Sequence, residues 1–259
     1  MRLVIREYLG MLREEGEFDV LLPDLLLAMN IVPLSKSQKG VRQGGVDVAG
    51  IKTEATGEKT LWLFVLKRGD LGRREWDSQP QSIRQSLEEI KDIYLRNHLS
   101  AEHANLPIVI VVGTTGEFKQ EIEQGRVGYA ETNTLPNRSY EWWNGDYVAS
   151  LIEQHLLNEY ALPAASRSQL RRALALIGTP GYDLEHFFAL LKSLLEWEND
   201  ASGSEVKRES ASVRALLTIL LSLGIVCRWA EQEGNLRVAV TACERTLLEL
   251  PLLNRTPCG

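Results

Sequence analysis

The sequence Gly44-Gly-Val-Asp-Val-Ala-Gly-Ile-Lys-Thr53, a turn at 56–58 and the run Thr60-Leu-Trp-Leu-Phe-Val-Leu-Lys67 predict two neighbouring strands, 46–53 and 60–67. The second strand is apolar from Leu61 to Leu66, which is typical of a strand buried on both faces. With the turn centred near residue 57, residues whose numbers sum to 114 or 115 face each other. Asp47 is then expected opposite Lys67 or Arg68, at one cross-strand neighbour distance.

The segments around this hairpin alternate between helical and strand patterns. Helices are expected at 2–15, 22–29, 77–99 and 147–159, and strands at 31–34, 107–112 and 139–143. This order predicts an α/β layer around a mixed sheet. Beyond residue 163 only helices are expected, at 166–177, 183–198, 213–231 and 236–250, with an exposed loop over 199–212. The sequence therefore predicts an α/β domain over 1–160 and a helical domain over 161–259.

Charge is distributed unevenly along the chain. The 259 residues carry a formal net charge of −6, which gives no global reason to expect nucleic-acid binding. Between Lys36 and Arg74, however, nine Lys and Arg residues stand against four acids. The local excess of positive charge indicates either a surface for an anionic partner or an ordinary solvated hairpin.

The three cysteines, Cys227, Cys243 and Cys258, include no CxxC pair, so neither a zinc site nor a disulfide framework is indicated. Reduced thiols in the cytoplasm are the simplest account. The first residues lack the apolar segment of a signal peptide. The most apolar stretch, 215–227, is too short to cross a bilayer and is expected to be a buried helix. We therefore expect a soluble cytoplasmic protein with no membrane partner.

Asp47 and Lys67 are the candidate catalytic pair. Cleavage of a phosphodiester needs a metal ion that polarises the phosphoryl group, a carboxylate that holds the ion, and a cation near the developing charge. Asp47 and Lys67 could supply the last two. The alternative is a cross-strand Asp–Lys ion pair, which is common and contributes little at a surface.

Four short segments resemble the PD-(D/E)XK, or restriction-endonuclease-like, superfamily, particularly its Mrr-like branch. They are Gly44-Gly-Val-Asp-Val48, Phe64-Val-Leu-Lys67, Phe18-Asp19 before Leu25-Leu-Leu-Ala-Met29, and Asn144-Gly-Asp-Tyr-Val-Ala-Ser-Leu-Ile-Glu-Gln-His155. The resemblance covers about residues 15–158. In that family a Gly-rich loop delivers a metal-binding aspartate, and an acid or Gln, any residue and then Lys close the next strand.

This resemblance implies a restriction-endonuclease-like fold and Mg²⁺- or Mn²⁺-dependent cleavage of DNA, in restriction or defence against foreign DNA. Asp47 would bind the metal, Lys67 would position or activate the attacking water, and Asp19 would be an additional acid. The residues expected to contact DNA are Lys52, Arg68, Arg73 and Arg74. Dimers are common among such nucleases, and the helical domain is a candidate surface for a protein partner.

One position departs from the family pattern. The second acid is expected two residues before the lysine, where this chain has Val65. The carboxylate could have migrated to Glu54, Asp70 or Asp19. Otherwise the metal would bind through Asp47, a backbone carbonyl and water, or the domain would have lost catalysis and kept binding to DNA or a protein partner. These alternatives stay open on sequence alone.

Two further segments have structural interpretations. Trp76 follows the basic stretch Lys67–Arg74 and is expected to be buried, because large aromatic side chains usually pack. Gly113-Thr-Thr-Gly-Glu-Phe-Lys119 lacks the spacing of a phosphate-binding loop, so a turn at the end of a strand is expected there.

Overall fold

The computed structural model describes residues 1–34, 44–199 and 205–250. Contacts within the chain divide it into two compact units, Leu12–His155 and a second unit that joins Met1–Met11 to Leu156–Gly259. The predicted boundary at residue 160 lies close to this division, and the N-terminal helix groups with the C-terminal helices. Most of the glycine-bearing stretch 35–45, including Lys36, Lys39 and Arg42, lies outside the described residues.

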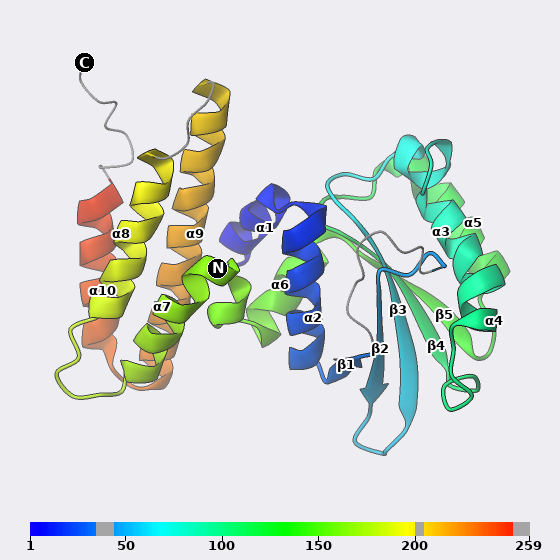
Figure 1. Ribbon diagram of the computed structural model, residues 1–259, viewed down its shortest axis with the longest axis horizontal. Coiled ribbons are helices and arrows are strands. Elements are labelled where there is room, and N and C mark those ends of the chain that lie inside the picture. Colours follow the sequence, from blue (N-terminus) through cyan, green and yellow to red (C-terminus); the bar gives the residue numbers. More distant parts are fainter. Residues whose placement is uncertain (35–43, 200–204, 251–259) are drawn as a thin grey trace. The chain divides into compact units, whose positions relative to one another are not determined.

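The Leu12–His155 unit contains a five-stranded mixed sheet in the order β1-β2-β3-β4-β5 (Figure 1). Its strands are β1 (Ile31–Pro33), β2 (Val48–Thr53), β3 (Lys59–Lys67), β4 (Ile108–Thr114) and β5 (Arg138–Trp143). The β1–β2 and β2–β3 pairs are antiparallel, and the β3–β4 and β4–β5 pairs are parallel. The predicted α/β class with a mixed sheet is confirmed.

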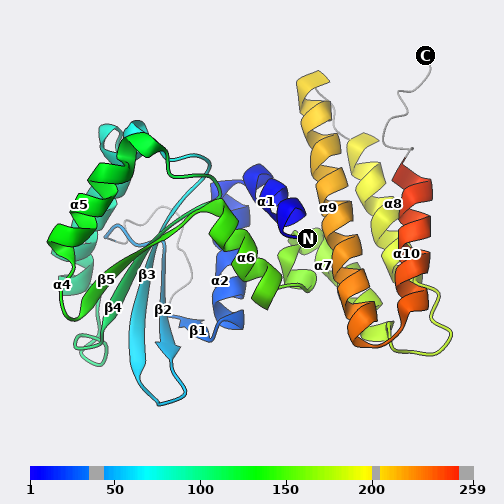
Figure 2. The same cartoon turned by 180° about the vertical axis from the view of Figure 1, so that it is seen from behind.

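Helices cover both faces of this sheet (Figures 1 and 2). One face carries α2 (Asp19–Ala28) and α6 (Gly145–His155), and the other carries α3 (Ile83–Glu89), α4 (Leu95–Asn97) and α5 (Glu123–Asn133). Short π-helical segments occupy Glu14–Phe18, Arg74–Ser78 and Ile90–Tyr94, and a 3₁₀ turn occupies Gln120–Ile122.

The central strand β3 is buried on both faces, as its apolar run predicts. Leu61, Leu63 and Val65 belong to the core cluster that includes side chains of α3 and α5. On the opposite face Phe64 packs against Trp143, with ring centroids 5.4 Å apart. The middle of the sheet is therefore held from both sides.

One prediction for this unit was wrong, and one helix had no predicted bounds. The continuous helix over 77–99 is interrupted: Ser82 accepts a hydrogen bond from the backbone N–H of Gln85 and caps a new start at α3. The possible helix after residue 119 had no bounds predicted from the sequence, and the structure has α5 there. The α5 helix is hard to recognise because it contains Gly125 and Gly128 and buries only Tyr129. A Cβ at Gly125 would lie 3.1 Å from the indole nitrogen of Trp76, so glycine allows a close approach.

The second unit is helical. Its helices are α1 (Arg2–Met11), α7 (Ala164–Leu176), α8 (Glu185–Asn199), α9 (Glu205–Gln232) and α10 (Leu236–Glu249), with a 3₁₀ turn at Glu159–Ala161. The first helix ends four residues earlier than predicted. The predicted loop 199–212 was wrong from Glu205 onward, where α9 begins. A polar first turn of a long helix has no apolar periodicity that would mark it in the sequence.

Helix α9 contains the stretch Ser210–Gln232, the one helical stretch among the described residues that is long and apolar enough to cross a membrane. It is thus longer than the apolar segment 215–227 recognised in the sequence. In the structure α9 packs against α1, α7, α8 and α10. Its buried hydroxyls, on Thr218 and Ser222, each donate to the carbonyl four residues earlier, at 2.8 and 2.7 Å. About 39% of its apolar window is buried, so the predicted burial holds for part of this helix.

Candidate functional site

Three parallel strands end at one edge of the sheet. The carboxyl ends of β3, β4 and β5 meet there because these strands run in the same direction. The antiparallel β2 begins at the same edge, where Val48 pairs with Phe64. Ligands of α/β sheets bind outside the carboxyl ends of the strands. We call this region the carboxyl edge and define it by Asp47, Lys67, Arg68, Asp70, Thr114, Thr115, Glu117 and Asn144.

Asp47 is fixed to the end of β3 by its backbone and by its side chain. Its backbone N–H donates to the carbonyl of Phe64 at 2.8 Å, and its Oδ2 accepts the backbone N–H of Leu66 at 2.6 Å. The residue is nevertheless exposed.

The hairpin register differs from the prediction by two or three residues. Val48 pairs with Phe64 and Thr53 with Lys59, so paired residue numbers sum to 112. Continuing this register places Val65, and not Lys67, opposite Asp47. Lys67 lies two residues further along β3, at a diagonal distance of about 7–8 Å. Asp47 and Lys67 are still neighbours at the carboxyl edge, since Asp47 bonds to the residue next to Lys67.

Lys67 ends β3 beside Thr114 of β4. Strand alternation places it on the same face as Leu63 and Val65, which belong to the core. Its side chain is partly exposed, and within the described part of the chain the ammonium group forms no hydrogen bond or ion pair. The structure therefore leaves this cation available to an anion at the carboxyl edge.

Val65 occupies the position of the missing acid and is 1% exposed. It packs in the core cluster, so its side chain contributes only to stability. Of the alternative acids, Glu54 lies at the opposite end of the hairpin, where it pairs with Lys52 at 2.8 Å. The length of β2, about 17–20 Å, separates Glu54 from Asp47. Glu54 therefore cannot be the displaced second acid.

Asp70 and Asp19 are the two remaining acids. Asp70 lies at the carboxyl edge, where its Oδ1 accepts the backbone N–H of Glu117 at 3.0 Å. Asp19 begins α2, and its Oδ1 is buried without a hydrogen-bond partner among the described residues. A buried carboxylate oxygen usually has such a partner. No three His, Cys, Asp or Glu side chains of the described ranges form a metal-binding group, so these acids do not converge with Asp47 as a triad.

Among the described residues the carboxyl edge offers no group of three side chains that could hold a metal ion by themselves. Mg²⁺ is commonly bound by one or two carboxylates together with water and substrate phosphates. Asp47 supplies one carboxylate at the edge, and Val65 supplies none. A DNA phosphate and water would have to complete the coordination.

The basic loop after β3 is held against the loop after β4. Thr114 Oγ1 donates to the carbonyl of Gly69 at 2.6 Å, and the N–H of Gly69 donates to Thr115 Oγ1 at 3.0 Å. Further along, Leu71 and Glu117 are joined by a backbone hydrogen bond of 2.8 Å. These bonds fix the backbone that carries the basic side chains.

Arg68 and Arg73 are exposed on this loop, and Arg74 is exposed at the start of the π-helical segment that follows it. Their charge is partly offset by Glu75: the N–H of Gly72 donates to its carboxylate at 3.0 Å and holds the pKa of that carboxyl below its usual range. Trp76 is 5% exposed, which confirms its predicted burial. The loop therefore presents arginines on an anchored backbone.

Lys52 lies far from this loop. It pairs with Glu54 and sits 5.8 Å from the ring centroid of Trp62, near the turn end of the hairpin. The structure therefore brings together Asp47, Lys67 and Arg68 but leaves Lys52 at the other end of β2. A role of Lys52 in DNA binding stays a prediction.

Sequence reasoning missed the polar residues that join the strand ends. Asn144 Nδ2 donates to Glu117 Oε2 at 2.8 Å, and the N–H of Gly145 donates to the carbonyl of Gly116 at 2.8 Å. A Cβ at Gly116 would collide with the backbone of Gly69. The glycines and threonines of 113–116 were the available signal. They were interpreted only as a turn at the end of a strand; in the structure Gly113 and Thr114 still belong to β4, and the chain bends at Thr115 and Gly116.

No protein-family model, no curated protein and no solved structure matches the chain. The conclusions about function therefore depend on the residues of the carboxyl edge and on their resemblance to the nuclease motifs.

Proposed function

We propose that the Leu12–His155 unit is a restriction-endonuclease-like domain that cleaves DNA with Mg²⁺ or Mn²⁺, in restriction or defence against foreign DNA. The observation that carries the proposal is the hydrogen bond from Leu66 to the Asp47 carboxylate, which places that acid beside Lys67. The strand order supports it: two antiparallel pairs are followed by a helical crossover to the parallel strand β4.

Each residue has a distinct role in this proposal. Asp47 would hold the metal ion, and the ion, when bound, would supply Lewis acidity and lower the pKa of a water molecule. The Lys67 ammonium would orient that water or stabilise negative charge that develops on the phosphate. Arg68, Arg73 and Arg74 would neutralise backbone phosphates, giving binding that weakens with salt and reads little sequence.

A second candidate function is a nuclease-like domain that binds DNA without cutting it. The burial of Val65 favours this alternative, because the position of the second acid has become part of the core. Both functions use the same arginines and the same edge. They differ in whether one carboxylate is enough to hold a catalytic ion.

The test is cleavage of plasmid and linear DNA with Mg²⁺ or Mn²⁺. The proposal expects cutting that EDTA abolishes and that Asp47→Ala and Lys67→Ala each reduce by about 100-fold or more. Glu58→Ala and Lys59→Ala are matched controls, because these residues lie at the turn end of β3 and are exposed. They should leave cutting unchanged.

The remaining outcomes distinguish the two functions. Folded wild-type protein that binds DNA but cuts it with neither metal would contradict the nuclease and support the silent binder. Protein that neither cuts nor binds DNA would contradict both. Equal losses in the Lys59→Ala and Lys67→Ala proteins would show that the carboxyl edge is not the site.

A further inference from the structure

Helix α10 has two apolar faces. Val238, Ala242 and Thr246 are buried, and the helix packs on α8 and α9. On another side of the helix Leu236, Val240 and Leu247 are 64%, 55% and 67% exposed. Burial in the bundle therefore accounts for one face of α10 and leaves the second unexplained.

The exposed face has the spacing of a helix-packing seam. Leu236, Val240, Cys243 and Leu247 follow one another at intervals of four, three and four residues, which places them on one stripe of the helix. Cys243 is partly buried and borders α9, with its Sγ 3.7 Å from that of Cys227. We call these four residues the α10 stripe.

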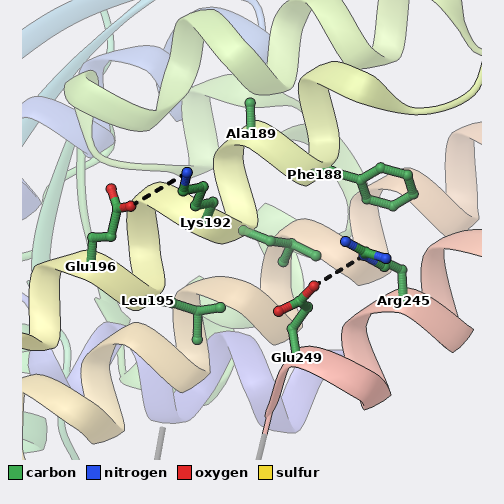
Figure 3. A pocket seen from close by; sticks show the side chains of 8 residues that line it. Phe188, Ala189, Lys192, Leu195, Glu196, Arg245 and Glu249 are labelled. Carbon is green, nitrogen blue, oxygen red and sulfur yellow. Dashed lines mark ion pairs between the residues drawn. The ribbon is translucent and has the colours of Figure 1, made fainter. Parts of the chain in front are cut away.

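The stripe is separate from the groove on the α8 side of the same helix. That groove has a volume of about 510 Å³, and Phe188, Arg245 and Glu249 are among the residues that line it (Figure 3). Arg245 pairs with Glu249 at 3.1 Å and lies 5.5 Å from the ring centroid of Phe188. The charges of the groove are thus partnered within the chain, and they give no indication of a ligand.

Two charges of opposite sign border the stripe on its solvent side. Arg237 follows Leu236 by one residue, and Glu244 follows Cys243 by one residue. Both are exposed and lie one heptad apart. In a seam between two helices these are the flanking positions that set the orientation of the partner.

We propose that a second copy of this chain covers the α10 stripe, with the two α10 helices antiparallel about a two-fold axis. In this arrangement Leu236 faces Leu247 of the second copy, and Val240 faces Cys243 of the second copy. Arg237 then lies within two residues in height, about 3 Å, of Glu244 of the second copy. The symmetry axis repeats each contact, so one stripe supplies both halves of a closed interface.

Charge selects the antiparallel orientation. In a parallel pair the two-fold axis runs along the seam and places Arg237 and Glu244 of the two copies on opposite sides of it, so that arrangement pairs none of these opposite charges. The antiparallel pair instead matches opposite charges twice. The proposal is independent of the nuclease activity, and its consequence is an assembly that contains two Leu12–His155 units.

The mass of the full chain in solution tests the proposal, measured by light scattering and sedimentation over a range of concentrations. We expect a dimer whose Kd rises about 30-fold or more in Val240→Glu, since a charge would enter the middle of the apolar seam. Leu248→Glu is the matched control. Leu248 is on the same helix and 72% exposed but lies outside the stripe, so this change should leave Kd unaltered.

A charge exchange tests the orientation. Arg237→Glu and Glu244→Arg proteins should each dimerise more weakly than wild type, because each homodimer would contain two like-charged pairs. An equal mixture should dimerise more tightly than either, because the heterodimer has opposite charges in both pairs. Arg237 and Glu244 are both exposed, so the circular dichroism spectra of the two variants should match that of wild type.

Three results would overturn the inference. If the wild-type protein remains monomeric at every concentration, a second copy does not cover the α10 stripe. A dimer that Val240→Glu and Leu248→Glu weaken equally would place the interface elsewhere. A mixture that dimerises no more tightly than the single variants would exclude the antiparallel register.

Discussion

The β2–β3 hairpin carries acids and lysines at both ends, and the two ends differ in what surrounds them. At the turn end Glu54 pairs with Lys52 at 2.8 Å, with side chains 49% and 32% exposed. At the carboxyl edge Asp47 accepts a backbone N–H at 2.6 Å, and Lys67 ends its strand beside Thr114. The same residue types thus form a surface ion pair at one end and a fixed, separately placed acid and cation at the other.

This difference shows that the position of an acid and a lysine in the sheet, more than their residue types, determines which contacts their side chains make. An exposed ion pair neutralises itself and contributes little to stability. The carboxyl edge collects the ends of three parallel strands, and the loops there are joined by hydrogen bonds through Thr114, Thr115 and Asn144. A ligand can therefore be bound by groups whose positions are already set.

The largest predicted effect is on the core beneath this edge. Val65→Glu would place a carboxylate at a position that is 1% exposed, and an uncompensated buried charge destabilises by about 3–5 kcal/mol. Lys59→Glu, at the exposed turn end of the same strand, should change stability little. Urea unfolding followed by circular dichroism measures both.

A stable Val65→Glu protein would contradict the burial of this position. If that protein also cut DNA faster than wild type, residue 65 would open onto the carboxyl edge, and the family's second acid would have been restored. The carboxyl edge would then contain a second acid for a metal ion, which the burial of Val65 does not provide in the present structure.

The next effect concerns two glycines at opposite ends of the hairpin region. A Cβ at Gly116 would collide with the backbone of Gly69, so Gly116→Ala should cost about 2–3 kcal/mol and separate the two loops. Gly57 has a φ of +86° but open space around it. Gly57→Ala should cost only the backbone strain, about 1–2 kcal/mol.

The same two substitutions should also differ in their effect on DNA binding. Gly116→Ala should weaken it, because the loop of Arg68 and Arg73 loses its anchor, whereas Gly57→Ala should leave it unchanged once both proteins are compared below their unfolding temperatures. A gel-shift titration with a fixed duplex measures the Kd of each variant for DNA. Equal binding by the two variants would show that the anchored loop is not required.

The strands could be predicted from sequence because their signals are local. The runs Leu61–Leu66 and Ile108–Val112 are apolar and uninterrupted, and each occupies a strand in the structure. The register could not be predicted to the residue. Thr53 pairs with Lys59, and Glu54 bonds to Glu58, which centres the turn at 56 rather than 57. A shift of one residue in the turn moves every cross-strand pair by two.

The candidate site depends on that register and on contacts between distant segments. Asp47 and Lys67 could be selected by their residue types, but the bond from Leu66 to Asp47 follows only from the observed pairing. The loop contacts of Gly69 with Thr114 and Thr115 join segments 45 and 46 residues apart. No periodicity in the sequence encodes such contacts, which arise when β3 and β4 pair.

A smaller effect on stability is expected from the acids themselves. Asp47→Ala removes a charge-assisted hydrogen bond to the backbone and leaves the N–H of Leu66 without its acceptor, at a cost of about 1 kcal/mol. Glu54→Ala removes only an exposed ion pair and should cost less than about 0.5 kcal/mol. Urea unfolding at low and high salt separates the two. Equal costs would show that Asp47 is no better fixed than Glu54.

The smallest predicted effect is on the salt dependence of DNA binding, which distinguishes the two ends of the β2–β3 hairpin. Each phosphate contact contributes about one to the positive slope of log Kd against log salt, so Arg74→Ala should reduce the measured slope by about that amount across unrelated DNA sequences. Lys52→Ala should leave the slope unchanged, because Lys52 is paired with Glu54 at the far end of β2. A reduction by Lys52→Ala as large as that by Arg74→Ala would mean that DNA lies along the whole hairpin, and the carboxyl edge would then be only one part of a longer binding surface.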